Sequence, residues 1–176
     1  MNPSAELCKI DAYPNADFAG MYGHEKPTDP SCVKSRSGFV ITFADVPILW
    51  QSKLQTETAL STMEAEIIAL AACCRELFPI IDMVLELTTS VQLPIGETTM
   101  NLSVHEDNSG ALVSAPPQFT PRSKYYASKT IWFREEIHKR GIKLLKINTA
   151  KQLGDIFTKG LVQVTFEYLQ KKLIGW

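Results

Sequence analysis

The chain has 176 residues, of which 45% are hydrophobic and 21% are charged, and its formal net charge is −1. This length predicts one domain, and the composition excludes a largely disordered chain. The near-zero charge neither favours nor excludes a polyanionic partner, because a nucleic-acid binder of this composition would have to gather its Lys and Arg on one face.

The cysteines and the N-terminus exclude further classes. No C-x-x-C pair or Cys/His cluster has zinc spacing, so we expect buried or half-buried thiols in a reducing compartment. No signal-peptide core is present, and no apolar run is long enough to cross a bilayer. We therefore expect no membrane partner and a cytoplasmic or nuclear location. The four cysteines are Cys8, Cys32, Cys73 and Cys74.

Three strands are predicted in the first third of the chain. Residues 8–13 have strand character and end at Pro14, and the segment 21–37, rich in Pro, Ser and Gly, is predicted as a surface loop. The next two strands are predicted to form a hairpin around a turn at Asp45-Val46. They cover residues 38–44 and 47–52.

A helix is predicted to begin after Ser61. Ser61 and Glu64 have the S-x-x-E spacing of a capping box, with Ser61 as the N-cap. Apolar residues recur at helical spacing as far as Phe78, so one face is expected to pack on the sheet. Pro79 is predicted to kink this helix or to split it in two.

The second half of the chain predicts alternating strands and helices. A loop at 88–98 precedes a strand from Met100 to His105 and an acidic turn at 106–108, and prolines make 114–126 irregular. The remaining elements are a helix at 128–141, a strand at 143–148 and helical pieces at 151–161 and 164–176. This order predicts an α/β fold: a mixed sheet, three antiparallel strands and then parallel strands, flanked by helices.

Several acids fall at strand ends and helix starts, where the sites of such sheets lie. Carboxylates that converge from separate elements hold pairs of Mg²⁺ ions, which activate a water and stabilise the leaving oxygen of a phosphodiester. Composition alone favours a plainer interpretation, in which these acids serve helix dipoles and turns. The end of the first strand carries Asn15 and then Asp17. The acids are Glu64, Glu66, Asp107 and Asp155.

Five stretches, in order along nearly the whole chain, are similar to motifs of one family. YPNADFAG is similar to Y-x-D-A-D-[WF]-A-G, and SRSGFVITF to S-x-S-G-Y-x-x-x. ILWQSKLQTETALSTMEAEIIAL is similar to W-x-S-K-x-Q-x-x-x-x-x-S-T-x-E-A-E-Y-x-A-L. EDNSGAL and QLGDIFTKGL are similar to D-N-x-x-A-[IL] and Q-x-A-D-[IL]-x-T-K-x-L. Together they resemble the ribonuclease H domain of Ty1/copia-type retrotransposon polyproteins.

The resemblance implies an RNase H-like fold and an endonuclease that hydrolyses RNA in RNA–DNA hybrids with a D-E-D-D carboxylate set and two Mg²⁺ ions, or Mn²⁺. Carried over, the third and fourth acids are Asp107 and Asp155. The glutamate is Glu66 by the pattern E-x-x-A, with Glu64 as the alternative. Asn15 stands where the family has its first aspartate.

Asn15 is a serious departure, because an amide lacks charge and presents an NH₂ donor where a cation needs an oxygen. Asp17 and Asp11 share its strand face by alternation, so Asp17 is a candidate substitute, although catalytic positions tolerate little displacement. We therefore expect impaired metal binding.

Other departures point the same way. The family's Lys-His-Ile is Lys124-Tyr125-Tyr126 here, and its Ala-Asp is Gly154-Asp155, which we expect to loosen the presenting helix by about 1 kcal/mol. Such drift is typical of a decayed element copy, and an engineered Asn15 is equally compatible.

The resemblance also implies two partners, the RNA–DNA hybrid and an upstream reverse transcriptase domain in the same polyprotein. If expressed, the protein is expected to associate with virus-like particles. No small-molecule cofactor is expected. Residues 1–176 are then one RNase H-like domain, a fragment of a longer chain. A non-catalytic nucleic-acid or protein-binding remnant is the alternative, and a DNA-strand-transfer enzyme of the same fold is a weaker one. The candidate hybrid-binding residues, which would otherwise form a solvated helix face, are Arg122, Lys124, Tyr125 and Lys129.

Overall fold

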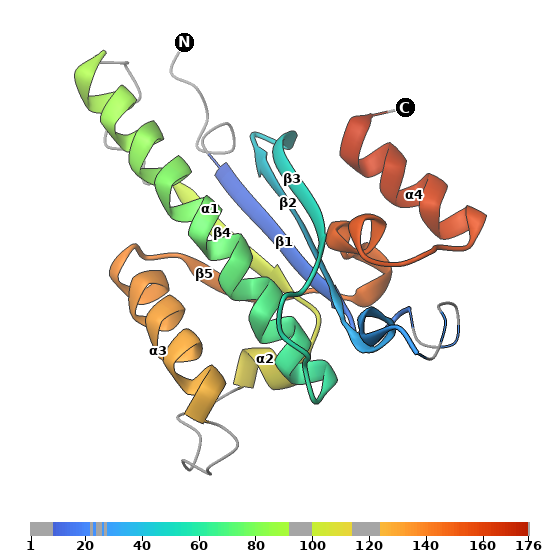
Figure 1. The fold of residues 1–176 in the computed structure, drawn as a ribbon. Helices are drawn as coiled ribbons and strands as arrows, with labels where there is room; N and C mark the ends of the chain where they lie inside the picture. Colours follow the sequence, from blue (N-terminus) through green and yellow to red (C-terminus); the bar gives the residue numbers. More distant parts are fainter. Residues whose placement is uncertain are drawn as a thin grey trace.

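The computed structural model describes residues 9–21, 23, 26, 28–91, 100–113 and 124–175, and its core is one five-stranded sheet (Figure 1). The order across the sheet is β3-β2-β1-β4-β5. β1 pairs antiparallel with β2 and β2 with β3, whereas β4 is parallel to β1 and β5 is parallel to β4. The predicted mixed α/β sheet is therefore confirmed. The strands are β1 (Lys9–Asp17), β2 (Arg36–Phe43), β3 (Val46–Leu54), β4 (Asn101–Glu106) and β5 (Lys143–Lys146).

The prediction that the first strand ends at Pro14 is wrong. β1 continues to Asp17, and its pairing with β2 includes Pro14. The strand tolerates this proline because the ladder between β1 and β4 ends at Ala12, so β1 has no strand neighbour on that side at Pro14. The extension carries Asn15 into the sheet, opposite Gly38 of β2.

The hairpin between β2 and β3 turns one residue earlier than predicted. Ala44 and Asp45 form the turn with φ values of 49° and 66°. Two consecutive left-handed residues are the geometry of the type I′ turn, whose twist matches that of the strands it joins. The predicted loop 21–37 contains the 3₁₀ helix η2 (Pro30–Val33) in its described part.

The long helix α1 (Thr62–Ser90) begins as predicted. The side chain of Ser61 caps it by accepting the backbone N–H of Glu64 at 3.1 Å. The helix is not split at Pro79, whose ring lies on the exposed side. It also extends to Ser90, into the first residues of the predicted loop 88–98, most of which lies outside the described residues.

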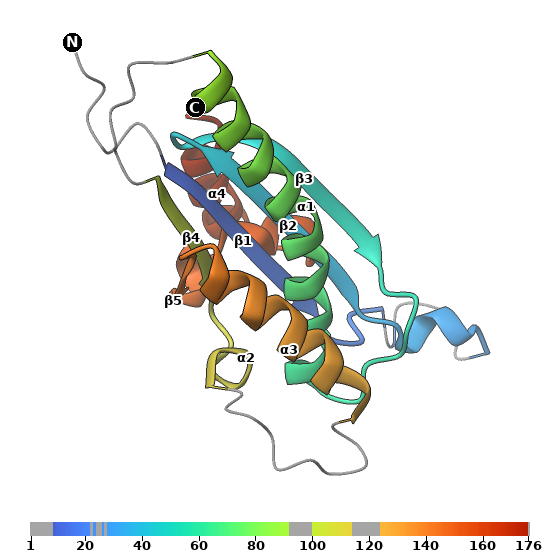
Figure 2. The same cartoon turned by 90° about the vertical axis from the view of Figure 1, so that its left-hand side faces the viewer.

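Helices cover both faces of the sheet (Figures 1 and 2). α1 packs on one face over a core that includes Ile10, Leu70 and Val104, and α3 lies against α1. α4 covers the other face, where Val40 and Leu169 are buried. The remaining helices are α2 (Ser109–Val113), α3 (Lys124–Lys139), η3 (Thr149–Lys151), η4 (Leu153–Phe157) and α4 (Gln163–Ile174).

Two smaller expectations can be compared with this fold. α3 begins at Lys124, so 124–126 are helical rather than irregular, as predicted for 114–126, and 114–123 lie outside the described residues. Cys32, Cys73 and Cys74 are buried free thiols, as expected, whereas Cys8 lies outside the description. Within the described chain, no helix combines the length and the apolar character needed to span a membrane.

Candidate metal centre

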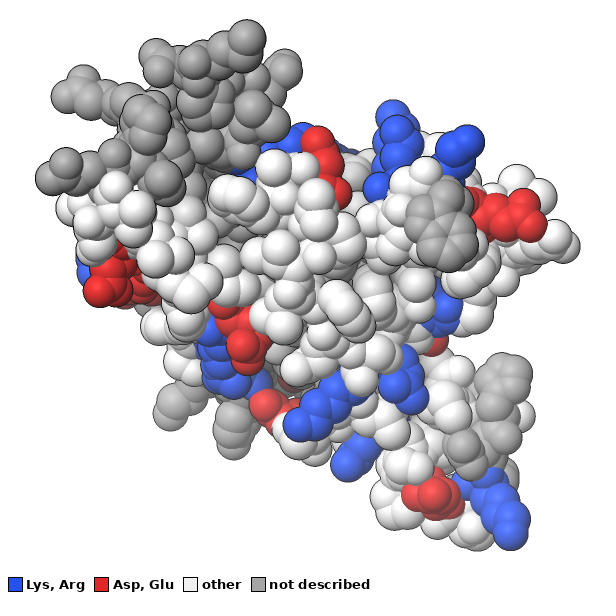
Figure 3. Space-filling model, turned by 90° about the horizontal axis from the view of Figure 1, so that it is seen from above, with Lys and Arg blue, Asp and Glu red and all other residues white. Residues whose placement is uncertain are grey.

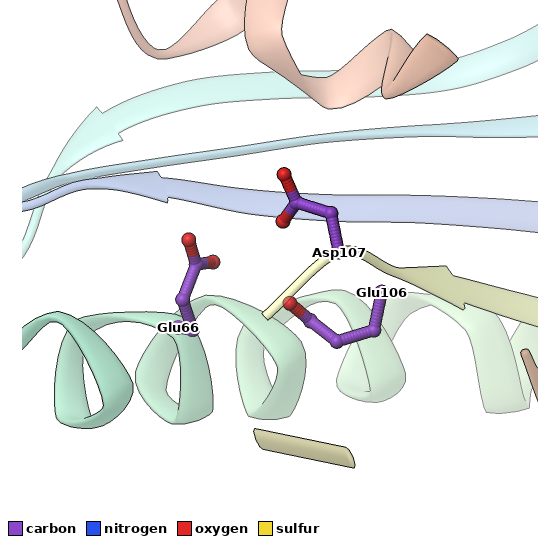
Figure 4. A group of neighbouring side chains, drawn as sticks. All are labelled: Glu66, Glu106 and Asp107. Carbon is purple, nitrogen blue, oxygen red and sulfur yellow. The ribbon is translucent and has the colours of Figure 1, made fainter. Parts of the chain in front are cut away.

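Three carboxylates converge at the end of the sheet where α1 begins and β4 ends (Figure 4). Glu66 comes from the second turn of α1, Glu106 is the last residue of β4, and Asp107 follows it. One oxygen from each lies within 4.8 Å of the others. Figure 4 shows all three side chains turned toward the space between α1 and the end of β4.

Glu106 is the member of this group that our sequence analysis missed. Its side chain is in step with Leu102 and Val104, which face the core beneath α1, and it is completely buried. Its Oε1 accepts the backbone N–H of Asn108 at 2.9 Å, and its Oε2 has no hydrogen-bond partner among the described residues. A glutamate at an inward-facing strand position was the signal in the sequence that marked it.

Glu66 and Glu64 have different roles in the first turns of α1. Glu64 Oε2 accepts the backbone N–H of Leu60 at 2.8 Å, so it serves the helix cap. Glu66 is buried and reaches the carboxylate group, and its Oε2 also lacks a hydrogen-bond partner in the described structure. Gln55 fixes this turn by donating to Ala65 O at 2.9 Å and to Ser37 Oγ at 2.7 Å. The geometry therefore favours Glu66 over Glu64 as the metal-facing acid.

The shared environment raises the pKa of both buried glutamates. Burial is the largest cause for Glu66, and the negative charges of Glu106 and Asp107 add to it, so its pKa rises to about 9. Burial also raises the pKa of Glu106 to about 8, although the N–H groups of Asn108 and Asp107 act against it. A bound cation would counteract both shifts, because it stabilises the charged carboxylates.

Asp155 lies in η4, on the other side of the candidate centre. Lys159 Nζ is 2.9 Å from Asp155 Oδ1, an i,i+4 ion pair with the carboxylate almost fully buried. Burial raises the pKa of Asp155, with smaller contributions from Asp107 and Asp17, whereas Lys159 lowers it. The negative charge of Asp107 thus acts on Asp155, but Asp155 already has Lys159 as a positively charged partner.

Asn15 occupies the same side and is also satisfied by protein groups. Its Nδ2 donates to Thr158 Oγ1 at 2.6 Å, and Thr158 Oγ1 in turn donates to Asp155 O at 3.3 Å. Gly38 makes room for this contact, since a Cβ there would lie 2.8 Å from Thr158 Cγ2. The position of the first aspartate in the resemblance is therefore a buried amide within a hydrogen-bond chain.

Relatives of known type match almost the whole chain, although no family model does. The retrovirus-related Pol polyprotein from transposon TNT 1-94 of Nicotiana tabacum is 32% identical over 167 residues, which are 94% of this chain and 11% of the relative. Those from transposons RE2 and RE1 of Arabidopsis thaliana are 28% and 27% identical, over 93% of this chain and 10% of each relative. The chain thus spans about a tenth of the length of these polyproteins.

Solved structures with the same fold are ribonucleases H. LC11-RNase H1, isolated from compost by a metagenomic approach, superposes with a TM-score of 0.58 at 18% identity, covering 86% of this chain and 93% of the other. RNase H1 of Halobacterium salinarum gives 0.51 at 14% identity, over 85% of this chain and 94% of the other. The chain has the RNase H-like fold, and almost all of it is similar to a segment of copia-type retrotransposon Pol polyproteins.

Gly154 has a different role in this RNase H-like domain from the one we expected. It lies in a 3₁₀ helix pressed against β1, and a Cβ at this position would meet Tyr13 O at 2.5 Å and Asn15 Cβ at 2.9 Å. The glycine therefore permits close packing of η4, which places Asp155 beside Asn15, and the expectation that it loosens a helix is not supported.

Asp17 and Asp11, the neighbours considered as substitutes for Asn15, lie outside the carboxylate group. Asp11 Oδ1 lies 3.0 Å from His105 Nε2, and the His105 ring stacks on Tyr13 at 4.6 Å, so His105 packs at the strand. Asp17 is half-buried and lines a surface hollow with Arg36 and Lys159. Neither belongs to the Glu66, Glu106 and Asp107 group.

The predicted hybrid-binding residues are only partly described. Arg122 lies outside the described residues, and Lys124 and Tyr125 are placed at the start of α3 without described side chains. Lys129 forms an ion pair with Glu57 and lines a groove with Lys53 and Arg75. Their role in binding stays a prediction.

Proposed function

We propose that this domain is a divalent-metal-dependent ribonuclease for the RNA strand of RNA–DNA hybrids, with activity reduced by Asn15. The observation that carries this proposal is the convergence of Glu66, Glu106 and Asp107, two of which have buried oxygens without partners. Mg²⁺ and Mn²⁺ take such oxygen ligands. A solved structure with a TM-score of 0.52 is LC11-RNase H1 in complex with RNA/DNA hybrid, which supports the substrate class.

The residues on the Glu66 and Asp107 side of the site fit a metal centre, whereas those around Asp155 and Asn15 fit one less well. Glu66 and Asp107 would hold a divalent ion, which supplies water activation and charge stabilisation at the scissile phosphate. Asp155 would contribute less while Lys159 neutralises it, and Asn15 offers at most one neutral oxygen. In the polyprotein, a reverse transcriptase segment would deliver the hybrid to this end of the sheet.

The alternative is a module that binds nucleic acid or protein without cleaving. The pairs Asn15–Thr158 and Asp155–Lys159 favour it, because they give two of the four expected metal-facing positions a partner within the protein itself. Hybrid binding that weakens with salt, without cleavage under any metal condition, would support this alternative.

The test is cleavage of a labelled RNA–DNA hybrid in Mg²⁺ and in Mn²⁺ by the native chain and by Asp107→Asn. We expect slow cleavage by the native chain and at least a hundredfold less by Asp107→Asn, because the variant loses a metal-facing charge. Glu86→Gln, an exposed change on the same helix as Glu66, is the control and should cleave at the native rate. Equal cleavage by Asp107→Asn would contradict the proposal.

A further inference from the structure

We infer that Glu106 is a third carboxylate ligand, so that this domain holds one divalent cation between Glu66, Glu106 and Asp107. The inference rests on the proposed function and changes its metal centre. Glu106 is not one of the acids that the D-E-D-D pattern assigns, and a single ion here differs from the two that the pattern implies.

The three side chains come from two elements and meet at one point. One oxygen of each lies within 4.8 Å of the others, which is the spacing of oxygens around a shared cation rather than of carboxylates that avoid one another (Figure 4). Like charges this close repel strongly unless a cation or protons compensate them.

The burial of Glu106 is the independent observation that points to a ligand. The side chain is completely buried in the layer of Leu102 and Val104, where an uncompensated carboxylate is costly. The N–H of Asn108 holds Oε1, whereas Oε2 has no partner among the described residues, and neither has Oε2 of Glu66. A cation between these carboxylates would account for both buried oxygens that lack a donor.

The surroundings of Asp155 and Asn15 explain why we expect only one bound ion. Lys159 already places a positive charge on Asp155, and the amide of Asn15 directs its Nδ2 to Thr158. A second cation would have to displace the Lys159 ammonium and would find no charge at position 15. The lysine thus takes the electrostatic place of the second ion beside Asp155.

The experiment is calorimetric titration of Mn²⁺ into the metal-free chain, without nucleic acid, for the native protein, Glu106→Gln and Glu86→Gln. We expect one ion per native chain, at least tenfold weaker binding by Glu106→Gln, and unchanged binding by Glu86→Gln, whose site lies about 30 Å along α1 from Glu66. Native affinity in Glu106→Gln, or two ions per native chain, would overturn the inference.

A fold control and two further variants separate the possible failures. Glu106→Gln should retain the native circular dichroism spectrum and unfold in EDTA at the native temperature or above, because an amide replaces a buried carboxylate. Glu66→Gln and Asp107→Asn should also lose Mn²⁺ affinity. If only these two lose it, the inference fails and the proposed metal centre stands. If neither does, the centre and the inference both fail.

Discussion

Asn15 is held by a hydrogen-bond chain that suits an amide better than a carboxylate. Its Nδ2 donates to Thr158 Oγ1, which can then donate to Asp155 O. An aspartate at this position would require the Thr158 hydroxyl to turn and donate to the new carboxylate, and Asp155 O would lose that bond. The surroundings are therefore adjusted to asparagine, and a restored aspartate would have a local cost.

The buried glutamates predict a pH dependence of stability in the metal-free protein. The pKa values of Glu66 and Glu106 are raised to about 9 and about 8, above the ordinary value of 4.5. Between the ordinary pKa of 4.5 and the raised values, the folded state binds more protons than the unfolded state. The unfolding free energy therefore falls as pH rises through this window. Each full proton of difference corresponds to about 1.4 kcal/mol per pH unit.

Urea unfolding in EDTA at pH 5 and pH 8 measures this effect. The native chain should lose stability between the two, and Glu106→Gln should lose less, because one raised carboxyl is gone. The difference between the two proteins isolates Glu106 from other titrating groups. Identical pH profiles would show that Glu106 titrates as an ordinary surface carboxyl does.

At the scale of elements, the segment between η3 and η4 bridges β1 and β4 where these two strands stop pairing. β1 and β4 cease to pair after Ala12 and Val104, and the side chain of Gln152 fills the gap beyond. Its Nε2 donates to Pro14 O and to His105 O, both at 3.0 Å, and Gln152 is fully buried. This one amide fixes the ends of both strands that present the site.

We predict that Gln152→Ala lowers the unfolding free energy by about 2–3 kcal/mol, because two carbonyls at the divergent strand ends lose their donor. Chemical denaturation measures it, with Gln163→Ala as the matched control. Gln163 is exposed and bonds only Glu167 among the contacts described, so its change should stay within about 0.5 kcal/mol. Equal effects of the two variants would contradict this role.

The elements also show what the sequence could and could not predict. The cap at Ser61 and the start of α1 followed from local side-chain chemistry, which a sequence displays directly. The course of β1 through Pro14 did not, because it depends on where β4 stops pairing. Glu106 was overlooked because its position is defined by burial under α1 rather than by a motif.

For the molecule as a whole, the topology concentrates negative charge at one end of the sheet. The mixed order β3-β2-β1-β4-β5 sets the end of β4 near the start of α1, where Glu66, Glu106 and Asp107 gather. The opposite end carries Lys and Arg interspersed with Asp and Glu on the face seen in Figure 3. The described part of that face thus carries both signs of charge and has no large patch of one sign.

The most direct test of this account is a metal-titrated hybrid cleavage assay on the native chain and Asn15→Asp, side by side. A carboxylate at position 15 supplies the charge that the amide lacks, so we predict that the substitution raises the cleavage rate by at least tenfold, despite the cost at Thr158. It should also raise the number of Mn²⁺ ions bound from one to two. Unchanged cleavage and unchanged ion binding would contradict the assignment of Asn15 as the cause of reduced activity.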